Sequence, residues 1–205
     1  PGLELYVDFA GDTLSYIDME TGEMIKVQTF VSTLACTDYA FVLCVPSQKT
    51  EDFLYALRRA LEFYGGVPKI VVPDNLKAAV TRADKYEPTI NKAMEDMGNH
   101  YGFVVIPCQP AKPTQKSLVE NQVQMIYHRI YARLQHRQFF SLEELNMAVH
   151  ELLVRHNQTR MQQRAYTREE HFHAIERMAL RALPETPYLM KRYADVTVQQ
   201  NGHVY

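Results

Sequence analysis

The hydrophobic pattern of this chain changes its period near residue 50, and that change restricts the folds available to it. Before this point the pattern is that of strands, because apolar and polar residues alternate, or β-branched and aromatic residues gather, in residues 3–9, 14–17, 24–34 and 39–45. After it, apolar residues recur at helical spacing as far as the stop signal Gly65 and Gly66. We therefore expect an antiparallel meander followed by a helix that Thr50 caps.

Short apolar strands and helices alternate in the next part of the chain. Strands are predicted at residues 69–72 and 103–106, with a helix at 89–101 between them. This alternation predicts parallel pairing, so the fold should be α/β with a mixed sheet. Further helices are expected at residues 114–134, 141–157 and 168–183.

We expect three domains. Residues 1–140 should form the sheet and its helices, and residues 141–183 a helical extension that opens with a capping box at Ser141 to Glu144. A strand pattern returns within residues 196–205, around an Asn-Gly turn, so residues 184–205 are interpreted as the truncated start of a small β-domain. The chain opens on Pro1 without an initiator Met, as an excised fragment would.

Composition excludes several classes of protein. With 46% hydrophobic and 22% charged residues the chain is expected to be globular and not disordered. It contains no apolar run near the roughly 20 residues of a membrane span and no signal peptide, so a cytoplasmic location is predicted. Its three cysteines form no CxxC pair, which argues against a disulfide framework and a structural zinc site.

The net charge of −2 is unevenly distributed. Residues 1–109 carry nine Lys and Arg against fifteen Asp and Glu, whereas residues 110–170 carry nine against six. An acidic first half is unusual for a protein that binds nucleic acid, because affinity for phosphate comes mainly from Lys and Arg. If DNA is the substrate, other domains should supply much of the binding.

Three acids stand where an acid needs an explanation. Asp8 lies inside the first strand, Asp74 directly follows a buried strand, and Glu120 lies in the first turns of the long helix. Each has a structural alternative: Asp8 on the polar face of an edge strand, Asp74 in a turn, and Glu120 in a capping box with Ser117.

Taken together, the three carboxylates predict a metal site. Strands 3–9 and 69–72 should lie side by side, and the long helix should pack across them, so the acids can converge at one end of the sheet. Carboxylates that close repel one another unless cations are bound. Oxygen donors alone favour Mg²⁺, with Mn²⁺ as a substitute, and two such ions would support phosphoryl transfer.

At these positions the chain resembles the transposases of IstA type, from bacterial insertion sequences that also encode a helper ATPase. The matching segments are residues 7–12, 73–77, 111–120, 141–146, 156–157, 183–184 and 196–204. The 46 positions between Asp74 and Glu120 fit the DDE pattern of the wider superfamily. The resemblance covers nearly the whole chain and implies a ribonuclease-H-like, mixed five-stranded sheet flanked by helices.

The resemblance also implies a mechanism and a site. Asp8, Asp74 and Glu120 would hold two Mg²⁺ ions, water would nick DNA at the element ends, and the released 3′-hydroxyls would attack target DNA. Asn75 is expected to orient Asp74. The DNA contacts implied near the acids and along the long helix involve Lys77, Lys112, Lys116, Arg129, Arg133 and Arg137. The three arginines recur every four residues, and a solvated helix face is their alternative explanation.

The implied partners are DNA, the helper ATPase and further copies of the chain, as a multimer on paired DNA ends in a bacterial nucleoid. The fragment alone is expected to be monomeric. Two other functions remain open from the residues: a nuclease or resolvase of the same fold that cuts without joining, and an inactive, domesticated module that binds DNA.

Overall fold

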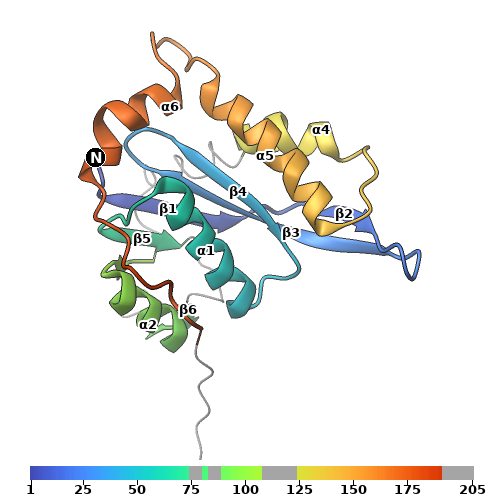
Figure 1. The fold of residues 1–205 in the computed structure, drawn as a ribbon, viewed down its shortest axis with the longest axis horizontal. Helices are drawn as coiled ribbons and strands as arrows, with labels where there is room; N and C mark the ends of the chain where they lie inside the picture. The colour runs from blue at the N-terminus through green and yellow to red at the C-terminus, as the bar shows by residue number, and fades with distance from the viewer. Residues whose placement is uncertain (74–79, 83–88, 108–123, 191–205) are drawn as a thin grey trace, which may run out of the picture.

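The computed structural model describes residues 1–73, 80–82, 89–107 and 124–190. Its centre is a mixed sheet of six strands against which helices pack (Figure 1). The strands of this sheet are β1 (Glu4–Phe9), β2 (Leu14–Ile17), β3 (Met24–Leu34), β4 (Ala40–Val45), β5 (Ile70–Pro73) and β8 (Val104–Val105). Two short strands, β6 (Val80–Arg82) and β7 (Thr89–Ile90), pair separately.

The long strand β3 organises the antiparallel half of the sheet. Backbone groups of successive residues point to alternate edges of a strand. Thr29 O accepts from Ala10 N at 2.8 Å, so it points toward β1. Glu23 is an even number of residues from Thr29, so its carbonyl points to the same edge, where it accepts from Asp18 N at 2.9 Å. β1 and β2 therefore follow one another along one edge of β3, and β4 pairs along the other edge. The expected five-stranded arrangement is present as β4, β3, β1, β5 and β8, in that order across the sheet. β2 makes a sixth strand.

The parallel half is also confirmed. β5 pairs with β1 in parallel, with Tyr6 opposite Val72 and Val7 opposite Pro73. β8 pairs in parallel with β5. Parallel neighbours need a long connection, and helix α2 (Lys92–Tyr101) lies in the one between β5 and β8.

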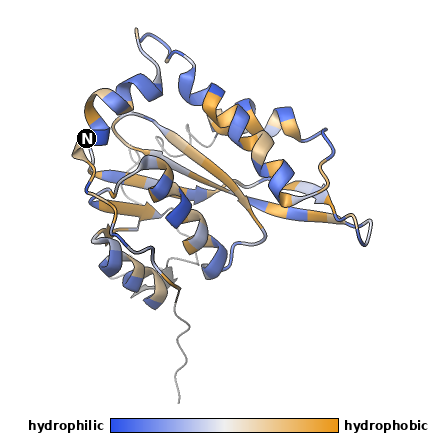
Figure 2. Cartoon of the chain, in the orientation of Figure 1, coloured by the Kyte–Doolittle hydropathy of each residue, from blue (hydrophilic) through white to orange (hydrophobic). Residues whose placement is uncertain are grey.

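Helix α1 (Thr50–Tyr64) turns its apolar face toward the sheet, as Figure 2 shows. Phe53 and Leu57 on this face are fully buried, and Gly65 ends the helix in the left-handed conformation, at φ 65°. The predicted cap at Thr50 is wrong by one residue. Lys49 occupies the cap position without a side-chain bond, and the Thr50 hydroxyl instead accepts from Asn91 Nδ2 at 3.2 Å.

The predicted helix at 89–101 begins three residues late. Thr89 and Ile90 form β7, whose partner β6 lies earlier in the chain. Asn91 is then the N-cap of α2, because its side chain accepts from Ala93 N at 2.9 Å.

Only the second half of the predicted helix at 114–134 lies within the described residues. Residues 124–126 are helical, η1 (Tyr127–Tyr131) is a π-helical turn, and α4 (Ala132–Leu134) completes the segment. The expected apolar stripe is confirmed there, since Ile126, Ile130 and Leu134 are buried.

Helix α5 (Leu142–Gln158) covers the outer edge of β4. The Asn146 side chain accepts from Cys44 N at 2.8 Å and donates to Cys44 O at 3.0 Å. The Asn157 side chain likewise accepts from Ala40 N at 3.1 Å and donates to Ala40 O at 2.9 Å. Two asparagines thus take the place of a neighbouring strand along β4.

The predicted capping box at the start of α5 is half confirmed. Ser141 accepts from Glu144 N at 3.0 Å, but the Glu144 carboxylate accepts from Phe140 N, not from Ser141 N. A complete capping box lies instead at Thr167 and Glu170, at the start of α6 (Arg168–His171).

The predicted helix at 168–183 is shorter and irregular. After α6 come a π-helical turn, η2 (Phe172–Glu176), and a 3₁₀ turn, η3 (Arg177–Ala179). Helix then ends because Arg181 exchanges two backbone hydrogen bonds with Val67, at 2.8 and 3.0 Å.

The Glu176 carboxylate, buried in η2, joins two distant parts of the chain. It accepts from Gly2 N at 3.1 Å and from the Thr37 hydroxyl, in the turn between β3 and β4. Gly2 has a φ of 66°, and a Cβ at that position would lie 2.4 Å from Ala179 O, so the position requires glycine.

Side chains of α5 and η2, among them Leu145, Val149, Leu153 and Phe172, belong to the same apolar core as the sheet. The expected division into three domains stays a prediction, and the expected hairpin at 196–205 lies outside the described residues. None of the helices described has the length and apolar character that crossing a membrane requires.

Candidate active site

Asp8 lies near the carboxyl end of β1, on the face of the sheet opposite α1. The alternate residues Val7 and Phe9 point toward α1, and the Phe9 ring lies 6.2 Å from that of Phe53. Tyr6 faces the other way and packs with Val72. Because residues two apart share a face, Asp8 lies on the Tyr6 side, where it is half-buried.

The edge-strand position in the structural alternative for Asp8 is wrong, because β1 is not an edge strand. β3 pairs with one side of β1 and β5 with the other. A carboxylate inside the central strand of a sheet is desolvated on both flanks, so it needs bonds that compensate. One is present, since Asp8 Oδ1 accepts from Phe9 N at 2.8 Å.

The register between β1 and β5 fixes what lies beside Asp8. Their last described pair is Val7 with Pro73, at the carboxyl ends of both strands. In open sheets with parallel strands, ligands bind beyond these ends. The backbone therefore brings the first predicted acid to the edge where β5 also ends.

The other acids, the asparagine and the lysines of the predicted site lie outside the described residues, namely Asp74, Asn75, Lys77, Lys112, Lys116 and Glu120. Within the described ranges, no three His, Cys, Asp or Glu side chains gather closely enough to hold a metal ion. The meeting of three carboxylates stays a prediction.

The three predicted DNA-contacting arginines do not form one helical stripe. Arg129 lies on η1 and is partly buried, Arg133 is exposed on α4, and Arg137 lies beyond the end of the helix. The helix ends at Leu134, and beyond it Phe139 is buried, with Phe139 O accepting from Ile17 N at 2.8 Å. The Arg137 guanidinium lies 5.1 Å from the Phe139 ring centroid.

A buried polar cluster that the sequence did not reveal lies where η1, α5 and α6 meet. His156 is 1% exposed and Arg168 is 3% exposed. Arg168 Nη1 donates to His156 O at 3.5 Å, and Nη2 lies 3.0 Å from Met125 Sδ. Local sequence could not reveal the cluster, because His156 and Arg168 sit at ordinary helix-end positions.

The cluster holds His156 neutral. Burial, which has the largest effect, and the charges of Arg168 and Arg129 together lower its pKa from 6.5 to about 3. Burial also lowers the pKa of Arg168, as does Arg129, while Asp38 raises it. Two cationic side chains and a neutral imidazole therefore share one buried space.

We expect this histidine to make the fold sensitive to acid. Its pKa is lower in the folded chain than in the unfolded chain, so the unfolded chain binds a proton first as the pH falls. The free energy of unfolding should not depend on His156 above about pH 7 and should fall by up to about 1.4 kcal/mol per pH unit between about pH 6.5 and 3.

Urea titrations of wild-type protein and a His156→Met variant across pH 4 to 8 test this expectation. The variant should lose that part of the pH dependence, and a variant of the exposed His150 on the same helix, His150→Gln, should keep it. If the free energy of unfolding of His156→Met depended on pH as steeply as that of the wild type, His156 would not be the source of the acid sensitivity.

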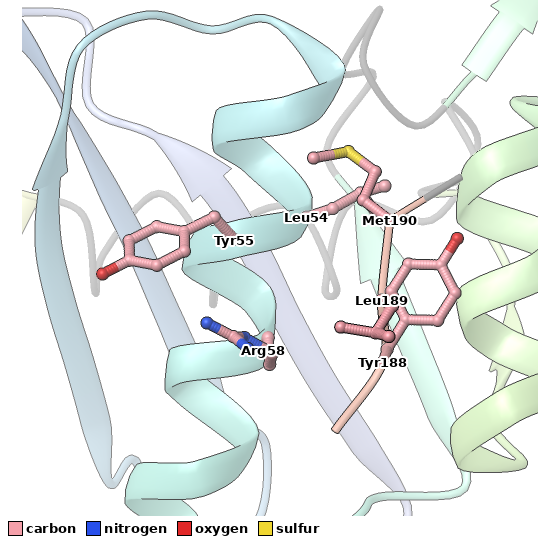
Figure 3. Close-up of a pocket in the computed structure, with 6 residues that line it drawn as sticks. All are labelled: Leu54, Tyr55, Arg58, Tyr188, Leu189 and Met190. Atoms are coloured by element: carbon pink, nitrogen blue, oxygen red, sulfur yellow. The ribbon is translucent and has the colours of Figure 1, made fainter. Parts of the chain in front are cut away.

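A cavity of about 190 Å³ lies away from Asp8, between α1 and the segment that follows Tyr188 (Figure 3). Arg58 is the one charged residue among the described residues of its lining, and Tyr188 OH donates to Ala93 O of α2 at 3.4 Å. The other lining residues are Leu54, Tyr55, Leu189 and Met190. None of its described lining residues carries a carboxylate or belongs to the candidate active site.

Comparison with known proteins agrees with this geometry. Residues 9–113 match the family described as the integrase core domain. A protein of Pseudomonas fluorescens assigned as the transposase for insertion sequence IS1162 is 36% identical over 203 residues, which is 99% of this chain and 36% of that protein. The chain thus spans little more than a third of that relative's length.

Solved structures share the fold at low sequence identity. The catalytic core of bovine immunodeficiency virus integrase superposes with a TM-score of 0.63 at 13% identity, covering 87% of this chain and 98% of that one. The catalytic core of HTLV-2 integrase, solved in complex with magnesium, gives 0.57 at 16% identity, covering 83% and 95%. The ribonuclease-H-like expectation is confirmed, and the family match over half of its length shows that the chain belongs to the integrase core domain family.

Proposed function

We propose that this chain is the catalytic core of a DNA transposase, in which Asp8, Asp74 and Glu120 hold two Mg²⁺ ions for DNA end cleavage and strand transfer. The observation that carries the proposal is the position of Asp8 at the carboxyl end of a central strand, beside the parallel end of β5. The family to which the chain belongs and its transposase relative support the same activity.

The strand register supports the pairing of the first two acids. Val7 lies opposite Pro73, and one further step along both strands would set Asp74 opposite Asp8. Side chains of paired residues share a face of a sheet, so both carboxylates would then emerge on the side away from α1. Glu120 would complete the set from the long helix whose second half packs its apolar stripe into the core.

The described part of the site fits a hard cation. The Asp8 carboxylate is half-buried, sits in a central strand and offers oxygen, the donor that Mg²⁺ prefers. Bound there, two such ions would stabilise the attacking and the leaving oxygens of an in-line phosphoryl transfer. Asp8 would contribute by holding its oxygens at a fixed point of the sheet, which the bond from Phe9 N helps to orient.

Partners follow from the same proposal. We infer that the full-length protein acts as a multimer on paired DNA ends together with a helper ATPase, and that the lysines at 77, 112 and 116 contact DNA phosphates near the acids. Phosphate contacts of this kind position a protein on DNA without reading its sequence.

Metal binding to this chain tests the site without relying on activity. In a Mn²⁺ titration followed by electron paramagnetic resonance, Asp8→Asn should weaken binding at least about tenfold, because one charged ligand oxygen is lost. Asp12→Asn removes an exposed acid from the following turn and should leave the affinity within about twofold. Equal affinities for wild type and Asp8→Asn would reject the metal site.

A further inference from the structure

The junction of η1, α5 and α6 holds buried cationic groups that lack acceptors. Arg168 Nε and Arg129 Nη1 are both shielded from solvent, and neither has a hydrogen-bond partner in the described part of the chain. With its other nitrogens Arg168 makes weak contacts to described residues, one to a carbonyl at 3.5 Å and one to the thioether of Met125. Guanidinium groups remain charged, so these nitrogens require an anionic or carbonyl acceptor.

His156 leaves two further positions open at the same place. Both of its ring nitrogens are buried without a hydrogen-bond partner among the described residues. As a neutral imidazole, it can donate from one nitrogen and accept at the other. The cluster therefore offers three unsatisfied donors from three different elements, η1, α5 and α6.

The charge balance of the cluster also favours an added anion. The positive charges of Arg129 and Arg168 each lower the pKa of His156, and Arg129 also lowers the pKa of Arg168, so the three groups oppose one another's positive charge. Asp38, in the turn before β4, is the acid that acts favourably on Arg168. Among the described residues, one carboxylate acts on Arg168 while two guanidinium groups share the cluster, and such an excess of buried positive charge is unfavourable without a counter-ion.

We propose that Arg129, His156 and Arg168 form a binding site for a phosphate-type oxyanion, either a DNA backbone phosphate or free inorganic phosphate. Planar guanidinium groups match the oxygens of phosphate in pairs, and an imidazole N–H adds a third donor. Arg129 is partly exposed, whereas His156 and Arg168 are buried, so Arg129 is the member of the cluster most accessible to solvent.

The site is separate from the candidate active site. His156 precedes Asn157, which bonds to Ala40 at the start of β4. β3 lies between β4 and β1, so the cluster lies on the order of 10 Å or more from Asp8, given about 4.8 Å between neighbouring strands. A DNA phosphate bound here would lie away from the phosphate that reacts. The DNA source rests on the proposed transposase function, whereas binding of free phosphate does not.

Thermal unfolding in the absence of divalent metal tests the proposal. Sodium phosphate should raise the unfolding temperature of the chain by about 3–6 °C at ten times its Kd, compared with sodium chloride at equal ionic strength. The shift should saturate with phosphate concentration. A shift no larger than that of chloride would overturn the proposal.

The effect of Arg129→Met on the unfolding temperature should change sign when phosphate is added, which a general salt effect would not produce. In phosphate-free buffer, Arg129→Met should raise the unfolding temperature, because it removes the repulsion with Arg168 while keeping a side chain of similar length. In saturating phosphate the same variant should unfold below wild type, because the anion loses a ligand. Arg155→Met, which removes an exposed arginine next to His156, should show no reversal. Reversal in both variants, or in neither, would reject the site.

Duplex DNA identifies the source of the anion. If a DNA phosphate occupies the site, a 20-bp duplex should bind wild type at least about fivefold more tightly than Arg129→Met in metal-free buffer, and free phosphate should compete for that difference. If free phosphate is the ligand, the duplex should bind both proteins equally while the phosphate-dependent reversal persists. Mn²⁺ binding at Asp8 should be unchanged in Arg129→Met. Loss of the oxyanion proposal would therefore leave Mn²⁺ binding intact, whereas loss of the proposed function would show as absent Mn²⁺ binding at Asp8.

Discussion

Replacing Asp8 by Asn in the full-length protein should reduce the proposed DNA end cleavage and strand transfer by about a thousandfold or more. The variant removes a charged metal ligand, and metal ions that stabilise a phosphoryl-transfer transition state contribute several kcal/mol, with each 1.4 kcal/mol worth a factor of ten. Rates should be measured with element-end duplexes and Mg²⁺, scoring nicked ends and joined products separately.

The same variant should fold normally. Asn is isosteric with Asp, and its Oδ1 can still accept from Phe9 N, so the unfolding temperature should stay within about 2 °C of wild type. Asp12→Asn, in the exposed turn, should retain activity. Cleavage without joining in the wild-type protein would favour the nuclease alternative, and full activity of Asp8→Asn would exclude the proposed role of this residue.

The largest effect on stability is expected at Glu176. Glu176→Ala should lower the free energy of unfolding by about 4 kcal/mol, because it leaves Gly2 N and the Thr37 hydroxyl buried without an acceptor and opens a cavity. For a chain of this length the unfolding temperature should fall by about 10 °C.

Chemical denaturation with urea measures this loss, and the exposed Glu151 on α5 provides the matched control. Glu151→Ala should change the free energy of unfolding by no more than about 0.5 kcal/mol. The loss in the free energy of unfolding for Glu176→Gln should lie between those of Glu151→Ala and Glu176→Ala, since the amide keeps one acceptor oxygen. A Glu176→Ala variant as stable as the control would mean that the carboxylate does not join the amino terminus to the turn before β4.

Elements with a strong local period could be predicted from the sequence. The apolar face of α1 and the glycine that ends it are both local signals, and the structure confirms them. The mixed sheet followed from the order of strands and helices, and Asp8 was identified because an acid inside a strand is unusual. These features depend on residues close together in the sequence.

The errors come from contacts between distant residues. Thr89 and Ile90 fit a helix but pair with β6, and helix ends after Ala179 because Arg181 pairs with Val67. The buried positions of His156 and Arg168 likewise depend on how η1, α5 and α6 meet, which no local pattern encodes. Tertiary packing overrides propensity at such places.

The two asparagines of α5 also determine how copies of this chain can assemble. A strand from a second molecule cannot join the sheet at β4 unless Asn146 and Asn157 first release the backbone groups of Cys44 and Ala40. On the opposite side, β8 offers only two residues for pairing. Crowding many copies of the chain on one DNA should therefore not drive them to polymerise through the β4 edge of the sheet.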